Sequence, residues 1–206
     1  LAGGSEAELV SFDLGEDAGM ACGGEMKVFL EPVAAGPSVL VVGGGHVGQA
    51  VASVAGGAGF RVSVVDDRED MVSERRFPGA ERRYVGGVEL LDGGIVVDGS
   101  TYVVVVTRGH RFDQEWVEAL AGHRPAYLGM IGSEKKVRMA CEALRKDGVP
   151  ESVVEAMHAP IGIDIGAETP DEIAVSVVAE IIAVRHGVSD TAMLKDKPGS
   201  KGRDRR

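Results

Sequence analysis

Three runs of consecutive apolar residues stand out along the chain because they lack the polar alternation of a half-exposed strand. They are residues 39–42, 102–106 and 126–131. Runs of this kind are typical of strands buried on both faces of a parallel sheet. Shorter or more polar segments at residues 25–30, 61–65, 82–85 and 95–97 are predicted as further strands. Residues 1–18 show no clear periodicity and are interpreted as a loop or the remnant of an upstream element.

Helical periodicity follows most of the buried strands. Apolar residues recur at helical spacing in 47–58, 112–120, 134–146 and 170–185, and a short helix is expected at 150–157. Asp113 is expected to cap the second of these helices, whereas Thr169 and Glu172 have the spacing of a capping box. Alternating strands and helices predict an α/β, Rossmann-like domain over residues 37–188, with a mostly parallel sheet and helices on both faces. A truncated amino-terminal piece, residues 1–36, precedes it, and a basic tail predicted to be disordered, residues 189–206, follows it.

The first buried strand leads directly into a glycine-rich turn. Gly43, Gly45 and Gly48 fit the pattern G-x-G-x-x-G, in which the second glycine lets a phosphate approach the backbone. His46 and Val47 lie at the predicted start of the helix, where free amides favour an anion. The next strand closes at Asp66 and Asp67, at the spacing from which an acid binds the hydroxyls of a ribose. The sequence therefore predicts a nucleotide-type or phosphate-binding site at this turn.

Two further loops at strand ends carry candidate residues, because ligands in open α/β sheets bind at the carboxyl ends of the strands. The first holds Thr107, Arg108 and His110, which suit anion binding or proton transfer; the alternative is a polar loop with one cap residue. The second loop consists of Gly132, Ser133 and Lys136, the last accompanied by another lysine. It offers amides, a hydroxyl and positive charge to a phosphate. Ser133 is expected to cap the following helix in either case.

Composition narrows the classes of partner. The net charge of −10 argues against a nucleic-acid surface, and an aromatic content of 4% argues against binding by extended ring stacking. No apolar run approaches the roughly 18 residues of a membrane span, and two cysteines do not make a disulfide framework. We therefore expect a soluble, cytoplasmic protein. Cys22 lies among glycines before residues 25–30, and it is either an incidental small residue or an accessible thiol suited to a soft metal.

The motifs taken together resemble one family. GGGHVG, VVDDRE, TRGH, YLGMIGSEKK and APIGIDIGAETPDEIAVSVVAEII, in this order, are similar to the xanthine dehydrogenase accessory proteins, the XdhC/CoxI-like family, over about residues 20–187. The resemblance implies a maturation factor that binds the molybdenum (molybdopterin) cofactor and delivers it to a xanthine or carbon monoxide dehydrogenase apoenzyme. It also places the family's CGG motif on Cys22, Gly23 and Gly24, which makes Cys22 the candidate cofactor-contacting thiol.

An accessory protein rather than an enzyme is therefore our preferred interpretation. The expected partner is a molybdenum hydroxylase apoenzyme, with a cysteine desulfurase and a second copy of the chain as further candidates. One alternative is an NAD(P)-dependent oxidoreductase, with Asp66 on the ribose and His110 as the acid–base group. Another is a regulatory domain that only binds a nucleotide, since Arg68 is able to attract a 2′-phosphate.

Overall fold

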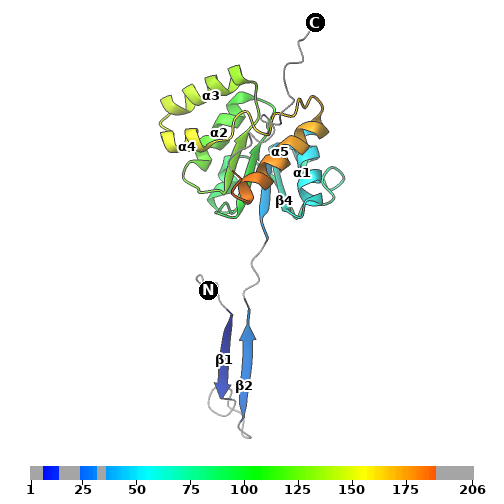
Figure 1. Ribbon diagram of the computed structural model, residues 1–206, viewed down its shortest axis with the longest axis vertical. Coiled ribbons are helices and arrows are strands. Elements are labelled where there is room, and N and C mark those ends of the chain that lie inside the picture. Colours follow the sequence, from blue (N-terminus) through cyan, green and yellow to red (C-terminus); the bar gives the residue numbers. More distant parts are fainter. Residues whose placement is uncertain (1–6, 14–23, 32–35, 189–206) are drawn as a thin grey trace, which may run out of the picture. The chain divides into compact units, whose positions relative to one another are not determined.

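The structure, a computed structural model, describes residues 7–13, 24–31 and 36–188 (Figure 1). The chain divides into two compact units, Leu1–Ala35 and Gly36–Arg206. Cys22, Gly23 and the tail at 189–206 lie outside the described residues. The expectations for the thiol and for the tail therefore stay predictions.

The first unit contains an antiparallel pair of strands. β1, Glu8–Asp13, pairs with β2, Glu25–Leu30, in the register that sets Val10 opposite Val28 and Phe12 opposite Met26. The prediction of a strand at 25–30 is confirmed. The interpretation of residues 1–18 as loop is wrong for 8–13, because a strand this short is recognisable only through the partner it pairs with.

The second unit is built on a five-stranded, wholly parallel sheet with the order β5-β4-β3-β6-β7. Its strands are β3, Ser38–Val42; β4, Arg61–Asp66; β5, Arg82–Val85; β6, Thr101–Val105; and β7, Tyr127–Met130. The first strand of the motif, β3, lies at the centre between β4 and β6. This arrangement confirms the predicted Rossmann-like fold, and it brings the loops after β3, β4 and β6 to one edge of the sheet.

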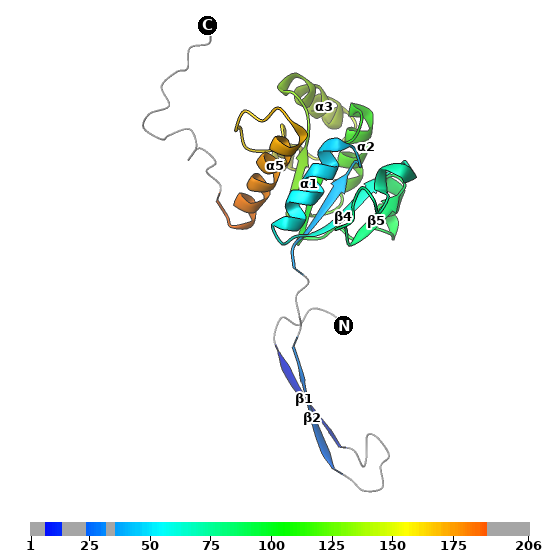
Figure 2. The same ribbon diagram turned by 90° about the vertical axis from the view of Figure 1, so that its right-hand side faces the viewer.

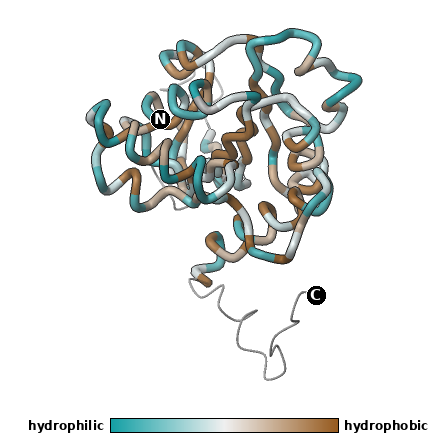
Figure 3. The backbone as a smooth tube through the Cα atoms, turned by 90° about the horizontal axis from the view of Figure 1, so that it is seen from above, coloured by the Kyte–Doolittle hydropathy of each residue, from teal (hydrophilic) through white to brown (hydrophobic). Residues whose placement is uncertain are grey.

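Helices cover both faces of the sheet, as predicted (Figures 1 and 2). α1, His46–Gly57, and α5, Pro170–Arg185, pack side by side on one face. The other face carries α2, His110–Leu120; α3, Glu134–Lys146; and α4, Glu151–Ala156. Alternate residues of each strand point to opposite faces, so Val41 joins the α1 and α5 core while Val42 joins the α2 and α3 core. Viewed from above, the hydrophobic colour is concentrated in the central strands (Figure 3).

Two local predictions are corrected. Residues 95–97 do not form a strand but follow a short 3-10 helix, η2 (Val88–Asp92). The apolar character of this segment reflects the burial of the Ile95 side chain and not strand pairing. A second 3-10 helix, η1, spans Glu69–Val72. Asp113 is not the N-cap of α2, because the helix begins at His110, three residues before Asp113, and Gly109 takes the cap position.

None of the described helices combines the length and the apolar composition needed to cross a bilayer.

Candidate functional site

The three glycines of the G-x-G-x-x-G pattern differ in whether the backbone requires a glycine at their position. Gly43 has a φ of +113°, and a Cβ atom there would lie 2.5 Å from the Val106 carbonyl oxygen. At Gly48 a Cβ atom would overlap the Gly43 carbonyl oxygen, so this glycine lets α1 lie against the loop. Gly45 is the exception. Its φ of −67° and ψ of −172° suit any residue, and an added Cβ atom would meet no heavy atom within 4 Å.

Open space at Gly45 coincides with an uncapped helix start. No side chain caps α1, and its first turn contains no acidic residue. In contrast, α3 is capped by Ser133, as predicted, and α5 has the predicted capping box of Thr169 and Glu172. The amides at the start of α1, like those of α2 and α4, thus have no side-chain cap, and open space lies beside them at Gly45.

Asp66 fixes the position of this loop. Its side chain is buried, and its Oδ2 accepts a hydrogen bond of 2.8 Å from the Gly44 amide. The Arg68 guanidinium donates to both oxygens, from Nε at 2.8 Å and from Nη2 at 3.0 Å, and the Arg68 amide donates at 3.1 Å. Burial raises the pKa of Asp66, but the hydrogen bonds from Arg68 and Gly44 outweigh it, so the pKa lies below its ordinary value. Arg76 holds the same loop by donating to the Gly44 carbonyl oxygen at 2.9 Å.

A second ion pair spans the ends of β4 and β6. Arg108 donates to both oxygens of Asp67, at 3.0 and 2.7 Å, and its guanidinium lies 4.6 Å from the centre of the Phe112 ring. The Thr107 amide and hydroxyl both donate to Asp113 Oδ1, at 3.1 and 2.6 Å. The loop after β6 is thus held by contacts with β4 and with α2. His110 is the first residue of α2.

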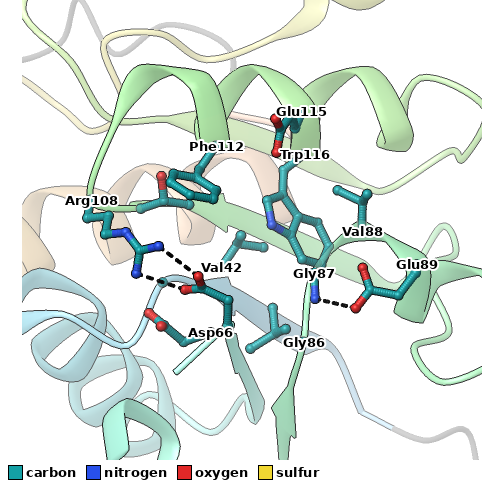
Figure 4. A pocket seen from close by; sticks show the side chains of 14 residues that line it. Val42, Asp66, Gly86, Gly87, Val88, Glu89, Arg108, Phe112, Glu115 and Trp116 are labelled. Carbon is teal, nitrogen blue, oxygen red and sulfur yellow. Dashed lines mark hydrogen bonds and ion pairs between the residues drawn. The ribbon is translucent and has the colours of Figure 1, made fainter. Parts of the chain in front are cut away.

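Seven of the predicted site residues line one cavity, which we call the loop cavity. It has a volume of about 370 Å³. Its lining consists of Gly43, Gly45, His46, Val47, Asp66, Arg68, Val106, Thr107, Arg108, Ile131 and Pro170. Gly48 and Asp67 do not line it, and Asp67 lines a smaller neighbouring slot (Figure 4).

The third predicted loop is less closely associated with this cavity. Ser133 and Lys136 are exposed and do not line the loop cavity. Gly132 lines a separate cavity of about 540 Å³, which we call the isoleucine cavity. Its lining includes Ile131, Ile161, Ile163, Ile165 and Ile173, together with Glu134, Asp164 and Ser176. Because Ile131 lines both cavities, the two adjoin.

Sequence reasoning missed a partly buried polar cluster behind the isoleucine cavity. The Tyr127 hydroxyl donates to Glu180 Oε2 at 2.5 Å, the Gly162 amide donates to the same oxygen at 2.9 Å, and His158 Nδ1 lies 3.3 Å from Glu180 Oε1. Burial, with the adjacent Glu180 carboxylate, raises the pKa of Tyr127. Burial also raises the pKa of Glu180, but hydrogen bonds from His158, Tyr127 and Gly162 outweigh it, and the pKa is lowered. The signal in the sequence was Glu180 itself, a charged residue on the apolar stripe of its helix.

The cluster holds the 158–162 segment against the edge of the sheet. The His158 amide donates to the Leu128 carbonyl oxygen at 2.9 Å, and the Met130 amide donates to the His158 carbonyl oxygen at 3.0 Å. Gly129 leaves the space that the Ile161 side chain and the Tyr127 hydroxyl occupy. Tyr127 and Glu180 therefore act on the wall of the isoleucine cavity, through the loop that forms it.

A family model described as the XdhC Rossmann domain matches residues 39–181. The chain belongs to this family. The matched range contains the glycine loop, both ion pairs and the isoleucine cavity, so all these features lie within the XdhC domain. Among the residues that the structure describes, no group of three or more His, Cys, Asp or Glu side chains is arranged to hold a metal ion.

Two curated relatives extend the comparison. The Escherichia coli (strain K12) protein YqeB, called uncharacterized, is 35% identical over 187 residues, which are 88% of this chain and 34% of YqeB. A Bacillus subtilis (strain 168) protein, named as a probable subunit of xanthine dehydrogenase, is 30% identical over 163 residues, 79% of this chain and 47% of that protein. This chain thus spans between a third and a half of the length of these relatives.

A solved structure supports the fold. The crystal structure of a xanthine dehydrogenase from Bacillus halodurans aligns with 86% of this chain and 47% of that chain, with a TM-score of 0.64 and 22% sequence identity. At this identity the likeness concerns the fold alone.

Proposed function

We propose that this XdhC-family protein binds a molybdopterin-type cofactor and delivers it to a molybdenum hydroxylase of the xanthine dehydrogenase type. The observation that carries the proposal is the open backbone at Gly45 beside the uncapped start of α1. Nothing in the packing of the described residues requires a glycine at this position. A ligand group that approaches the backbone closely does require one.

The group that fits the loop cavity is a phosphate. Amides at the start of α1 donate hydrogen bonds to its oxygens, and the helix dipole favours its negative charge. Arg68 and Arg108 line the same cavity but are paired with Asp66 and Asp67. A bound phosphate therefore competes with these carboxylates for the guanidinium groups, and such competition makes binding reversible, as a delivery protein needs.

The pterin ring of the cofactor suits the adjoining isoleucine cavity. Aliphatic side chains contact the faces of a flat ring system, and the carboxylates of Glu134 and Asp164 are able to accept hydrogen bonds from the amino-pyrimidine edge. The cofactor supplies the molybdenum chemistry of the recipient enzyme; the residues of this chain bind, orient and release it. We keep Cys22 as the candidate thiol for the metal end, with a cysteine desulfurase as a candidate partner in that step.

The NAD(P)-dependent oxidoreductase alternative has weaker support. Both oxygens of Asp66 already accept hydrogen bonds from the chain itself, so a ribose must displace the Arg68 guanidinium before it reaches them. Arg108, one of the two candidate catalytic residues, is held in its pair with Asp67. A nucleotide-binding regulatory domain remains the nearer alternative, because it requires only the loop cavity.

A delivery assay tests the proposal. The protein is purified from a host that makes the molybdenum cofactor and is mixed with xanthine dehydrogenase apoenzyme made without it. We expect the dehydrogenase activity to appear, and to be lost when Gly45→Val replaces the parent. The matched control is Gly56→Val, since Gly56 is exposed on the same helix and a Cβ atom there also meets nothing within 4 Å. Activation that does not depend on the protein, or that Gly45→Val retains in full, would contradict the proposal.

A further inference from the structure

We propose that the outward side of α5 is a homodimer interface, on which the α5 helix of a second copy of this chain packs antiparallel to the first. The proposal concerns assembly and does not depend on the cofactor site. α5 lies beside α1 on one face of the sheet, and no other described helix covers its outward side (Figures 1 and 2). We call the residues along that side the α5 stripe; they are Glu172, Val175, Ala179, Ile182 and His186.

The α5 stripe lacks the charged side chains that usually cover the exposed side of a helix. Its members recur every three or four residues and therefore share one side of α5. In its middle, Val175 is 52% exposed and Ile182 is 37% exposed, with Ala179 between them. Single exposed apolar residues are common, but here they are successive positions of one stripe. α5 thus presents apolar side chains to the solvent as well as to the sheet.

The neighbouring surface adds no charge to this side of the domain. α1 contains no Asp, Glu, Lys or Arg, and the one charged residue of α5 between Glu172 and Arg185 is Glu180, which is bonded to Tyr127. The helices on the other face differ. Seven exposed charged residues lie on α3 alone: Glu134, Lys135, Lys136, Arg138, Glu142, Arg145 and Lys146. In a chain with 26% charged residues, depletion on one side is typical of the core of a protein interface.

The two ends of α5 carry opposite charges on either side of Ala179. Asp171 and Glu172 lie in the first turn, whereas Arg185 lies in the last turn. This placement also suits the dipole of α5, but the dipole does not explain the apolar residues between the ends.

An antiparallel pair of α5 helices satisfies both features at once. With the two-fold axis beside Ala179, Val175 of each copy faces Ile182 of the other, and the acidic turn of one helix faces the basic turn of the other. The small side chain of Ala179 lets the two helices approach closely at the axis. A parallel pair would set like charges against each other at both ends, which disfavours it.

The charge of the chain restricts where two copies are able to meet. Its net charge of −10 makes two copies repel each other over most of their surface. The α5 stripe is neutral in its middle and balanced at its ends, so it avoids this repulsion. With 16 residues, α5 is about 24 Å long, and a single helix pair buries less than the roughly 800 Å² per partner of a standard interface. We therefore expect a weak dimer with a dissociation constant of roughly 1–100 μM.

Analytical ultracentrifugation of the full chain at concentrations up to about 500 μM measures this equilibrium. We expect Ile182→Glu to weaken the dimer by at least about 100-fold, because it sets a charge in an apolar contact. Val175→Glu should do the same and serves as the second variant. The matched control is Val96→Glu, since Val96 is 81% exposed and its neighbour Ile95 packs in the core on the other face of the sheet. Thermal melting of each variant shows whether it is folded.

A cysteine on the expected axis tests the geometry. Ala179→Cys should form a disulfide-linked dimer on mild oxidation, because the two-fold axis brings this position close to its own copy. Glu142→Cys is the matched control, since Glu142 is exposed on α3, on the other face. The parent protein, with its own two cysteines, gives the background of cross-linking.

A parent protein that stays monomeric at the highest concentration would overturn the inference, and so would a dimer that persists in both glutamate variants. A monomeric parent whose delivery of cofactor is lost in Ile182→Glu would also overturn it and assign the α5 stripe to the recipient enzyme. None of these results bears on pterin retention, which is measured separately, so the proposed function stands or fails on its own.

Discussion

Two glycines of one motif should respond to substitution in opposite ways. At Gly45 the backbone is in a region open to all residues, and a side chain meets no heavy atom within 4 Å. Replacing Gly45 by valine costs only the preference for glycine at a helix N-cap, about 1 kcal/mol or less. At Gly48 even the methyl group of alanine overlaps the Gly43 carbonyl oxygen and lies 3.2 Å from the Val41 side chain. Because the clash involves backbone, the cost should reach about 3 kcal/mol, the upper end for overpacked sites.

These free energies convert into melting temperatures. For a chain of this size each kcal/mol shifts the Tm by roughly 2–4 °C. Gly45→Val should therefore lower the Tm by about 4 °C at most, whereas Gly48→Ala should lower it by about 6–12 °C. The loss of ligand affinity should follow the opposite order and be larger for Gly45→Val than for Gly48→Ala. A valine at Gly45 blocks the approach of a phosphate, and loss of two charge-assisted hydrogen bonds at about 1.5–3 kcal/mol each weakens binding by at least 100-fold.

Thermal melting and calorimetry with inorganic pyrophosphate measure the two effects on the same samples, with Gly56→Val as the control for a glycine replaced elsewhere in α1. A Gly45→Val protein that melts as low as Gly48→Ala would show that Gly45 has a packing role. A Gly45→Val protein that binds pyrophosphate as tightly as the parent would show that Gly45 does not serve the phosphate.

Three further predictions concern the buried polar groups and the thiol. Tyr127→Phe should lower the free energy of unfolding by about 1 kcal/mol. Glu180→Ala should lower it by up to about 3 kcal/mol, because it leaves the buried Tyr127 hydroxyl without its acceptor. Urea unfolding at neutral pH measures both, and equal losses would contradict the role of Glu180 as that acceptor. The pKa of Asp66 is lower in the folded protein than its ordinary value of 3.8, so its ionised form stabilises the fold above that pH and the contribution is lost as the pH falls through the folded pKa. Asp66→Asn should therefore lose less stability than the parent when urea unfolding is repeated at pH 3, and an identical pH dependence would exclude Asp66. Cys22→Ala should lower cofactor retention and delivery without lowering the Tm, whereas unchanged delivery would show that the thiol is incidental.

The features that the sequence predicted well depend on local pattern. The run at 39–42 and the glycines after it are adjacent in the chain, and the acid at position 66 ends the next strand of the same strand–helix–strand unit. The capping box of Thr169 and Glu172 is local in the same sense, and the structure confirms it. Such features are predictable because a residue and its immediate neighbours determine them.

Features that join distant segments were not predictable in this way. The donors to Asp66 are Arg68 and the amide of Gly44, which lies 22 residues away, and the pairing of Arg108 with Asp67 spans 41 residues. The cluster of Tyr127 and Glu180 spans 53 residues and connects a strand to a helix. Residues 95–97 have the composition of a strand, but burial of Ile95 explains that composition without any pairing. These contacts depend on how distant segments pack together, and the pattern of neighbouring residues in the sequence does not predict that packing.

The pterin content of the purified protein tests the central claim most directly. The parent, Gly45→Val and Gly56→Val are isolated from a host that makes the molybdenum cofactor, and the pterin and molybdenum bound per chain are measured. We expect the parent and Gly56→Val to retain equal amounts of pterin, and Gly45→Val to retain little although it melts within about 4 °C of the parent. A parent protein that carries no pterin, or a Gly45→Val protein that carries as much as the parent, would contradict it.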